Sequence, residues 1–387
     1  MQYPRICTIE YNIFMQNTSQ TITANNNVRL LLDGHETFSA IKEALRNAQN
    51  FINLEYFLIS DDSTGNSIRN ILAERSRAGV RVRVIFDAAG SWNLGRKFVD
   101  ELRNAGAEIR RFMPLTLRNI FSGIIHRDHR KLITIDGKTG LLGGFNIGDV
   151  FLTQWRDTHL MLEGGAVNIL DGIFSEMWSR AGGKGFARES SARERVELSA
   201  AEKAGDIPVK VLASGTGKDF RAIADEYIRI ISSSRNRVWI TTPYLVPDRQ
   251  FLEAVYSAAR RGVDVRIIIP SESNHTLASW ASQSYIDALI RNGVRVFVYR
   301  DRFIHAKTLV ADSQIASVGT ANIDALSFGI NYEVQAFVYA LDIVKELENV
   351  FLADLQHCTE ETPDNRKARP FIQRLKEKTG RLLSPIL

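Results

Sequence analysis

The chain has 387 residues, 44% of them hydrophobic and 24% charged, which are the proportions of a globular protein with room for two domains of ordinary size. Its formal net charge of +5 favours anionic partners such as nucleic acid, acidic lipid or a phosphorylated substrate, without choosing among them. The two cysteines, Cys7 and Cys358, lie near opposite ends and form neither a disulfide framework nor a metal-binding spacing.

The first half of the chain alternates short apolar strands with amphipathic helices, a pattern typical of an α/β sandwich. Gly79 and Gly106 follow two of these helices, in the position where a glycine commonly ends a helix. We expect strands at 28–32, 51–57, 80–86 and 108–113 and helices at 38–48, 68–78 and 97–104.

The second half repeats this order. The string Gly-Val-Asp-Val-Arg-Ile-Ile-Ile at 262–269 aligns with Gly-Val-Arg-Val-Arg-Val-Ile-Phe at 79–86, and the recurrence of so many ordered features indicates that a whole domain was duplicated. The first half carries 11 extra residues, 115–125, and these are largely apolar. We expect second-half strands at 209–212, 238–244, 262–269, 294–299 and 334–339 and helices at 220–231 and 251–261.

The repeat divides the chain into four parts. We expect an N-terminal extension of residues 1–27, a first domain of residues 28–181, a linker of residues 182–207 and a second domain of residues 208–387. The second domain ends in a basic segment, 365–378, which fits either a helix lying on anionic lipid or an ordinary surface helix.

A histidine motif occurs once in each half. In each copy a lysine follows the histidine by 2 residues, an aspartate by 7 and an asparagine by 17. A single His-x-Lys carries little information, but two copies with the same skeleton predict one active site built from two halves. The first copy consists of His129, Lys131, Asp136 and Asn146, and the second of His305, Lys307, Asp312 and Asn322.

Strand geometry sorts the polar groups of these motifs. Residues i and i+2 of a strand share a face, so each histidine points the same way as its lysine. Asp136 and Asp312 stand at an odd offset, and we expect them to play a structural, supporting role. A second pair of acids, Asp157 and Glu333, each follows its asparagine by 11 residues. A carboxylate there can accept a proton from the histidine nitrogen that faces away from the substrate.

Two facing histidines, each with a lysine, suit phosphoryl chemistry. One imidazole attacks phosphorus, and the other, protonated, donates to the leaving oxygen. The lysines, with Asn146 and Asn322, would surround the non-bridging oxygens. A phosphohistidine intermediate needs neither a metal nor an organic cofactor, and we expect none. His126 and His129 have the spacing of a metal-binding pair but lack a third ligand.

Two other polar residues lie in apolar strands. His159 stands two residues after Asp157 and is either near the site or a hydrogen-bonded structural histidine. Glu55 is expected to be buried and paired, with an arginine as a suitable partner, and a role in the site is not favoured.

The double motif resembles the phospholipase D superfamily from about residue 27 to the end, and its flanking strings are closest to bacterial cardiolipin synthases. The resemblance implies two duplicated phospholipase D-like α-β-α sandwich domains around one shared active site. It also implies that His129 is the nucleophile, that His305 is the general acid and base, and that Lys131, Asp136, Lys307 and Asp312 complete the catalytic motif. Asn146, Asn322, Asp157 and Glu333 then bind phosphate or orient the histidines. The strings lie at 126–131, 143–149, 155–159, 317–324 and 383–387.

The reaction implied by this resemblance joins two phosphatidylglycerols into cardiolipin and releases glycerol. Hydrolysis with water as acceptor, cleavage of nucleic acid, and a non-catalytic binding module are the alternatives. Both His–Lys pairs are intact, which disfavours the binding module, and the apolar segment 115–125 suits lipid tails better than DNA. We therefore expect phosphatidylglycerol and an anionic membrane surface as partners and expect no nucleic acid.

Members of this family usually carry two N-terminal membrane-spanning helices. No apolar run here approaches the roughly 18 residues needed to span a bilayer, and the N-terminus has no signal peptide. The sequence is thus expected to be either a short form or a chain truncated at its start. We expect it to attach peripherally to the cell membrane, on the cytoplasmic face.

Overall fold

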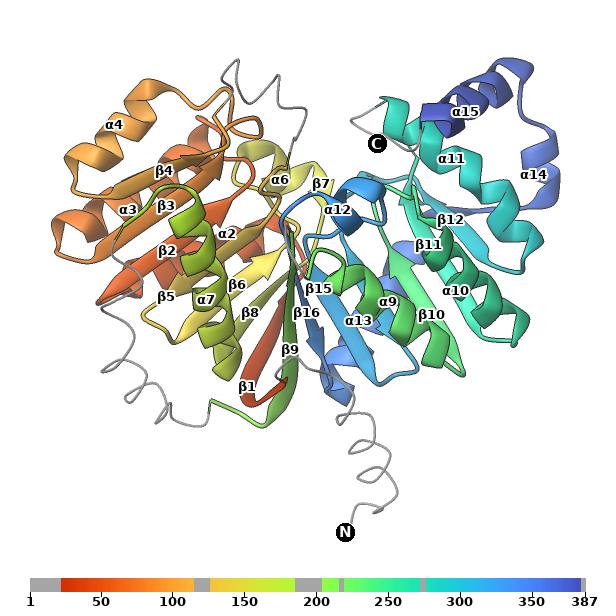
Figure 1. Cartoon of the computed structure of the whole chain (residues 1–387), viewed down its shortest axis with the longest axis horizontal. Helices are drawn as coiled ribbons and strands as arrows, with labels where there is room; N and C mark the ends of the chain where they lie inside the picture. Colours follow the sequence, from red (N-terminus) through yellow and green to blue (C-terminus); the bar gives the residue numbers. More distant parts are fainter. Residues whose placement is uncertain (1–21, 115–125, 185–203, 216–218, 272–275, 384–387) are drawn as a thin grey trace, which may run out of the picture.

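The computed structural model describes residues 22–114, 126–184, 204–215, 219–271 and 276–383. The apolar segment 115–125, most of the expected linker and residues 1–21 lie outside this range. Within it, one mixed sheet of 15 strands runs through the whole molecule (Figure 1). The described helices include none that is both long enough and apolar enough to cross a membrane.

The two halves of the sheet have the same strand order. From the centre outwards, the first half runs β1-β8-β6-β5-β2-β3-β4 and the second β9-β16-β15-β14-β10-β11-β12, with β17 added at the second edge. This confirms the predicted α/β fold with two repeated halves. The first-half strands are β1 (Ile22–Leu31), β2 (Phe51–Tyr56), β3 (Arg81–Asp87), β4 (Glu108–Phe112), β5 (Lys131–Ile135), β6 (Thr139–Gly143) and β8 (His159–Gly164). The second-half strands are β9 (Ile207–Ser214), β10 (Arg237–Thr241), β11 (Asp264–Pro270), β12 (Arg295–Tyr299), β14 (Thr308–Ala311), β15 (Ile315–Gly319), β16 (Glu333–Val338) and β17 (Cys358–Glu361).

Helices cover both faces of this sheet, as an α-β-α sandwich requires (Figure 1). Three of the longer helices, α7, α11 and α13, occupy stretches to which the sequence patterns assigned no element. The first-half helices are α2 (Gly34–Asn47), α3 (Ser63–Arg77), α4 (Arg96–Asn104), α6 (Asp149–Thr153) and α7 (Gly165–Arg180). The second-half helices are α9 (Ala222–Ser233), α10 (Arg249–Arg260), α11 (Thr276–Arg291), α12 (Ala325–Gly329), α13 (Leu341–Leu355), α14 (Pro363–Lys367) and α15 (Phe371–Leu383).

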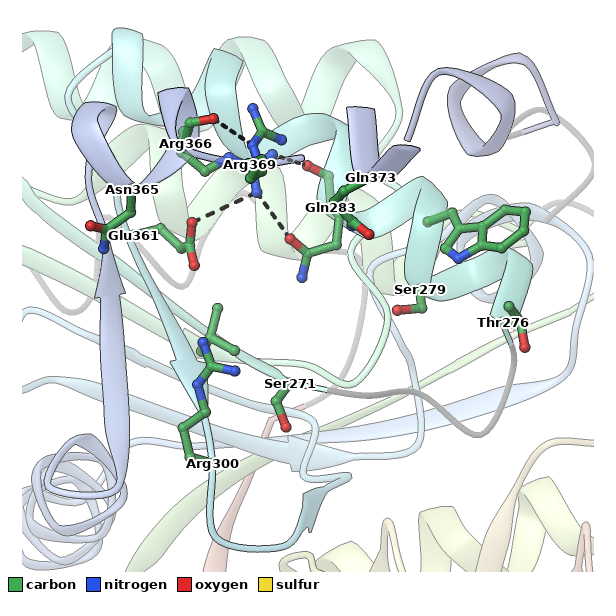
Figure 2. Close-up of a pocket in the computed structure, with 12 residues that line it drawn as sticks. Ser271, Thr276, Ser279, Gln283, Arg300, Glu361, Asn365, Arg366, Arg369 and Gln373 are labelled. Carbon is green, nitrogen blue, oxygen red and sulfur yellow. Dashed lines mark hydrogen bonds and ion pairs between the residues drawn. The ribbon is translucent and has the colours of Figure 1, made fainter. Parts of the chain in front are cut away.

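The basic C-terminal segment forms α14 and α15, which pack on α11. Buried Arg366 holds this end of the chain in place: its guanidinium donates to Gln283 Oε1 at 3.0 Å and lies 3.7 Å from Glu361 Oε2 (Figure 2). A pocket of about 490 Å³ lies beside these contacts, with Ser271 and Arg300 in its lining.

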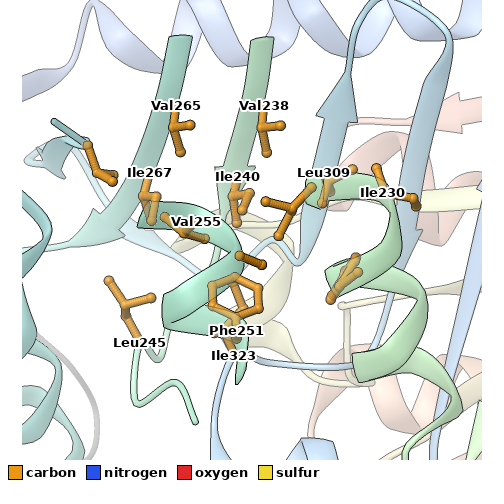
Figure 3. Packing of buried hydrophobic residues seen from close by; sticks show 14 of the residues in the cluster. Ile230, Val238, Ile240, Leu245, Phe251, Val255, Val265, Ile267, Leu309 and Ile323 are labelled. Atoms are coloured by element: carbon orange, nitrogen blue, oxygen red, sulfur yellow. The ribbon is translucent and has the colours of Figure 1, made fainter. Parts of the chain in front are cut away.

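Strand alternation divides the hydrophobic core between the two faces of the sheet. In β3, Val84 packs with α2, α3 and α4, whereas its neighbour Ile85 belongs to the central cluster beneath α7 and α13. The second half has its own cluster beneath α9, α10 and α11, where Phe251 and Val255 of α10 lie against the sheet (Figure 3).

The two halves meet where β1 pairs with β9 in antiparallel fashion. Strand β1 begins at Ile22, six residues before the expected strand at 28–32, and so reaches into the segment assigned to the N-terminal extension. The sequence does not reveal this part of the strand because most of its residues are polar. Asn26 is fully buried: its amide donates to Ile207 O at 2.8 Å, and its oxygen accepts from Ala166 N at 2.7 Å.

We predict that Asn26→Ala lowers the free energy of unfolding by about 2 kcal/mol, because it leaves a buried N–H and a buried carbonyl without a partner. The exposed neighbour Asn27, whose side chain bonds to half-exposed Glu163 and to the adjacent backbone N–H of Val28, is the matched control. Urea titration of both variants measures the difference, and an equal loss in Asn27→Ala would contradict this role for Asn26.

Candidate active site

Both histidines lie where segments of the two halves cross. His129 directly precedes Arg130 and β5, and its backbone N–H donates to Tyr332 O at 3.0 Å. His305 stands in the same place before β14, and its N–H donates to Arg156 O at 2.7 Å. A short parallel pair, β7 (Trp155–Arg156) with β13 (Phe303–Ile304), reinforces the second crossing. In Figure 1, β7, α6 and α12 lie in the upper middle of the view, between the two halves, and the crossing belongs to this region.

Each histidine side chain contacts a carboxylate of the other half. Nδ1 of His129 lies 3.0 Å from both carboxylate oxygens of Glu333, and Nδ1 of His305 lies 2.6 Å from Asp157 Oδ2. An ionised carboxylate only accepts hydrogen bonds, so Nδ1 carries the proton and the Nε2 of a neutral ring is left as the basic atom. The 11-residue spacing singled out these two acids, but it did not indicate that they are exchanged between the halves.

The two histidine–carboxylate pairs differ in their electrostatics. Burial lowers the pKa of His129, although Glu333 opposes this shift, so the ring is neutral at neutral pH. Burial favours a raised pKa for Glu333, but His129 and the Thr320 hydroxyl outweigh it and hold the pKa below its usual value. Burial raises the pKa of Asp157 despite the opposing charge of Lys307.

The two lysines are buried beside their histidines. Lys131 Nζ donates to His129 O at 2.6 Å, and Lys307 Nζ donates to His305 O at 2.5 Å. Burial lowers the pKa of Lys131 to about 8 and that of Lys307 to about 7, and each ammonium is within electrostatic range of carboxylates from both halves. An ammonium has three protons, so each lysine keeps donors for an anionic ligand, which would also favour its charged form.

Asn146 and Asn322 lie just beyond the ends of β6 and β15, at the same edge of the sheet as the histidines. Both are buried, and no described residue donates a hydrogen bond to either amide oxygen. Buried polar groups in native proteins are nearly always paired, so these amides mark a place where a ligand or water completes the site.

Asp136 and Asp312 do not join the histidines. Each stands in a turn with positive φ, 54° and 51° respectively, between two strands of the motif. The Asp136 carboxylate accepts hydrogen bonds from the backbone N–H groups of residues 49–51, and Asp312 accepts from those of residues 235–237. These contacts give the two aspartates the structural role that strand parity indicated and remove them from the candidate catalytic set.

The remaining histidines of the motif region contact backbone groups. His159 is fully buried, its Nδ1 accepts from Phe145 N at 3.2 Å, and burial lowers its pKa to about 4. His126 Nδ1 lies 2.7 Å from Ile330 O and so links the two halves. In the part of the chain that the structure describes, no three His, Cys, Asp or Glu side chains are grouped as metal ligands.

Sequence reasoning missed a charged cluster behind His129. Glu55, Asp128 and Arg130 are all buried, and Arg130 Nη1 lies 3.6 Å from Glu55 Oε1, which confirms an arginine partner for Glu55. Burial raises the pKa of Asp128 to about 7, and burial together with the Asp128 carboxylate raises that of Glu55. Both shifts favour the protonated form of a carboxyl group in this cluster near neutral pH.

The second half has no such cluster, because neutral side chains occupy the matching positions. Thr241 pairs with the strand residue that corresponds to the partner of Glu55. By the same alignment, Ile304 replaces Asp128 and Ala306 replaces Arg130. Comparison of the two repeats residue by residue is the sequence signal that finds this cluster.

The raised pKa of Asp128 predicts that the stability of the protein depends on pH. The folded pKa of about 7 exceeds the ordinary value of 3.8, so between these values the folded state holds a proton that the unfolded state has lost. The free energy of unfolding therefore falls as pH rises through this window. An amide at position 128 cannot titrate and resembles the protonated acid.

We predict that Asp128→Asn removes on the order of 2 kcal/mol of the stability that the wild type loses between about pH 5 and about pH 8. Asp100→Asn, a change of an exposed acid on α4, is expected to keep the wild-type pH dependence. Urea titration at the two pH values measures both slopes, and an unchanged slope in Asp128→Asn would rule out a raised pKa at Asp128.

Comparison with known proteins agrees with the duplicated fold and site. The family described as "Cardiolipin synthase, PLD-like domain" matches residues 41–178 and 227–355, one match in each half. The cardiolipin synthase of Alkalihalophilus pseudofirmus is 38% identical over 372 residues, which cover 95% of this chain and 73% of the relative. The major cardiolipin synthase ClsA of Bacillus subtilis is 38% identical over 381 residues, which cover 97% of this chain and 78% of the relative.

Among solved structures, phosphatidylserine synthase from Haemophilus influenzae is similar with a TM-score of 0.73, covering 98% of this chain and all of that one. The sequence identity is 16%, so this likeness concerns the fold alone. The match in both halves and the identity to the curated relatives over most of their length show that this chain belongs to the cardiolipin synthase family of phospholipase D-like proteins.

Proposed function

We propose that this protein is a phosphatidyl transferase that makes cardiolipin from two phosphatidylglycerols and releases glycerol, acting on lipid at a membrane surface. The observation that carries the proposal is the crossed pair of histidines, each oriented by a carboxylate of the other half, in a chain of this family. The names of the relatives supply the choice of lipid.

In the first step His129 is the nucleophile. Its Nε2 attacks the phosphorus of the first phosphatidylglycerol, and the bond from phosphorus to the glycerol headgroup oxygen breaks. Protonated His305 donates its proton to that oxygen, so glycerol leaves as a neutral alcohol. Glu333 stays hydrogen-bonded to Nδ1–H of His129 and offsets the positive charge of the phosphohistidine.

In the second step His305 acts as the base. It takes the proton from a glycerol hydroxyl of the second phosphatidylglycerol, and the oxygen attacks phosphorus while the P–N bond to His129 breaks. The products are cardiolipin and an enzyme in which His129 is again neutral and His305 is again protonated. Water in place of the lipid hydroxyl would give phosphatidic acid, so the outcome depends on which acceptor reaches the intermediate.

Two observations favour His129 over His305 as the nucleophile. The side chain of His129 is 13% exposed and that of His305 is 5% exposed, so the first imidazole is the more accessible to a lipid headgroup. Burial lowers the pKa of His129, which keeps its Nε2 unprotonated and reactive at neutral pH.

The lysines and asparagines would hold the phosphate. Lys131 and Lys307 are buried and keep donors for an anionic ligand, which favours their charged form, and Asn146 and Asn322 are buried amides at the same edge of the sheet. Preorganised donors of this kind stabilise the charge that develops on the non-bridging oxygens in the transition state.

The first test of this proposal is incubation of the purified protein with phosphatidylglycerol vesicles, with lipids and released glycerol measured together. We expect cardiolipin and glycerol in equal amounts. Phosphatidic acid as the main product would make the protein a hydrolase, and cleavage of DNA without lipid turnover would contradict the proposal altogether.

A second test changes the histidines one at a time. We predict that His129→Ala and His305→Ala each reduce transfer at least about a thousandfold, because each histidine serves in both steps. His35→Ala, a change of an exposed histidine on α2, should leave the rate unchanged. Circular dichroism and thermal melts check that the variants fold, and substantial activity in either single variant would defeat the two-histidine mechanism.

A further inference from the structure

Helix α15 has its faces reversed with respect to an ordinary surface helix, in which apolar side chains face the protein. The side that α15 turns towards α11 consists of polar residues and a glycine: Glu377 and Gly380 are buried and Gln373 is half-buried. The side it turns outwards is apolar: Phe371, Ile372, Leu375 and Leu382 are 77%, 65%, 51% and 79% exposed.

Buried charge fixes this orientation. Arg366 and Arg369 both donate to Asp287 of α11, at 2.7 Å in each case, and both also donate to Glu377 of α15. Gly380 lets the helix approach closely, because a Cβ there would lie 2.4 Å from the backbone nitrogen of Ala281. Rotation of α15 to hide its apolar side would break the ion pairs of Glu377 with both arginines.

Basic side chains border the apolar strip. At about 100° per residue, Arg374 and Lys378 lie along one side of it and Lys376 along the other, and all three are exposed. An exposed apolar strip between cations is the pattern of a helix that lies in a lipid interface. Its charge is complementary to anionic headgroups.

The position of α15 suits a protein whose site must meet lipid. In Figure 1 it lies along the upper edge of the molecule, and β7 and α12, which mark the site, lie in the upper middle of the view. Trp92, 74% exposed, follows the carboxyl end of β3, at the end of the sheet where His129 precedes β5. Leu277, at the start of α11 and 42% exposed, adds to the same edge.

We propose that α15 docks the protein on an anionic phospholipid surface. Phe371 and Leu375 enter the boundary of the acyl chains, while Arg374 and Lys378 contact the lipid phosphates. This deepens the proposed function, on which it rests for the choice of a lipid surface as the partner. The docked helix brings the edge that carries the two histidines towards the membrane.

Co-sedimentation of the full chain with vesicles tests this docking site. The vesicles contain phosphatidylcholine with or without phosphatidic acid, which is anionic but has no headgroup alcohol to transfer. We expect wild-type binding to require phosphatidic acid and to weaken with salt. Phe371→Ser with Leu375→Ser, or Arg374→Glu with Lys378→Glu, should weaken binding about tenfold or more.

A double variant on α13, Leu341→Ser with Leu352→Ser, is the matched control, since both residues are exposed apolar side chains on another helix. It should bind as the wild type does. Equal binding by the wild type and the Phe371→Ser, Leu375→Ser variant overturns the proposal. So does a wild-type dimer that this variant converts into a monomer in light scattering, because α15 would then be a contact between copies of the chain.

Transfer with a short-chain phosphatidylglycerol dissolved as monomers separates docking from chemistry. The α15 variants should keep the wild-type rate on this substrate, since they leave the site intact, and a matching loss there would contradict a docking role. If the wild type does not turn over this lipid while vesicle binding still depends on α15, the docking site stands and the proposed function fails.

Discussion

The hydrogen bond from each histidine to a carboxylate of the other half is the interaction on which the rest of the structure depends. Neither half orients its own imidazole: Glu333 holds His129 and Asp157 holds His305. Both carboxylates are fully buried. Separation of the halves would leave them without their histidine partners, at a cost of several kcal/mol. A site of this kind exists only in the docked pair.

The remainder of the fold keeps that docking rigid. The β1–β9 pairing turns two sheets into one, and Asn26 closes it by bonding to both halves at once. The backbone bonds from His129 to Tyr332 and from His305 to Arg156 repeat the crossing directly beside the imidazoles. Because a continuous sheet resists relative displacement of its parts, the two Nε2 atoms keep their relative positions, as the proposed two-step transfer requires.

The sequence predicted the local geometry of each motif, but it did not predict that each histidine pairs with a carboxylate of the other half. The strand period separated the histidine–lysine faces from Asp136 and Asp312, since it depends only on neighbouring residues. The histidine partner of each carboxylate could not be predicted. The equal spacings in the two copies fit a pairing within each half and a pairing between the halves equally well. Polar Asn26 concealed the start of β1 for a similar reason: its hydrogen-bond partners Ile207 and Ala166 are distant in the chain.

Duplication produces two equivalent sites, whereas transfer needs a nucleophile and an acid, so the differences between the copies carry information about chemistry. In the first half the position next to Asp157 is Gly144, where a Cβ would lie only 1.9 Å from Asp157 Oδ1. No side chain at this position can therefore donate a hydrogen bond to Asp157. The matching residue in the second half, Thr320, donates its hydroxyl to Glu333 and helps to keep that carboxylate ionised. The buried Glu55–Asp128–Arg130 cluster adds a second difference on the same side. Both differences act on the surroundings of His129, so its environment has diverged from that of His305 although the two motifs kept identical spacing.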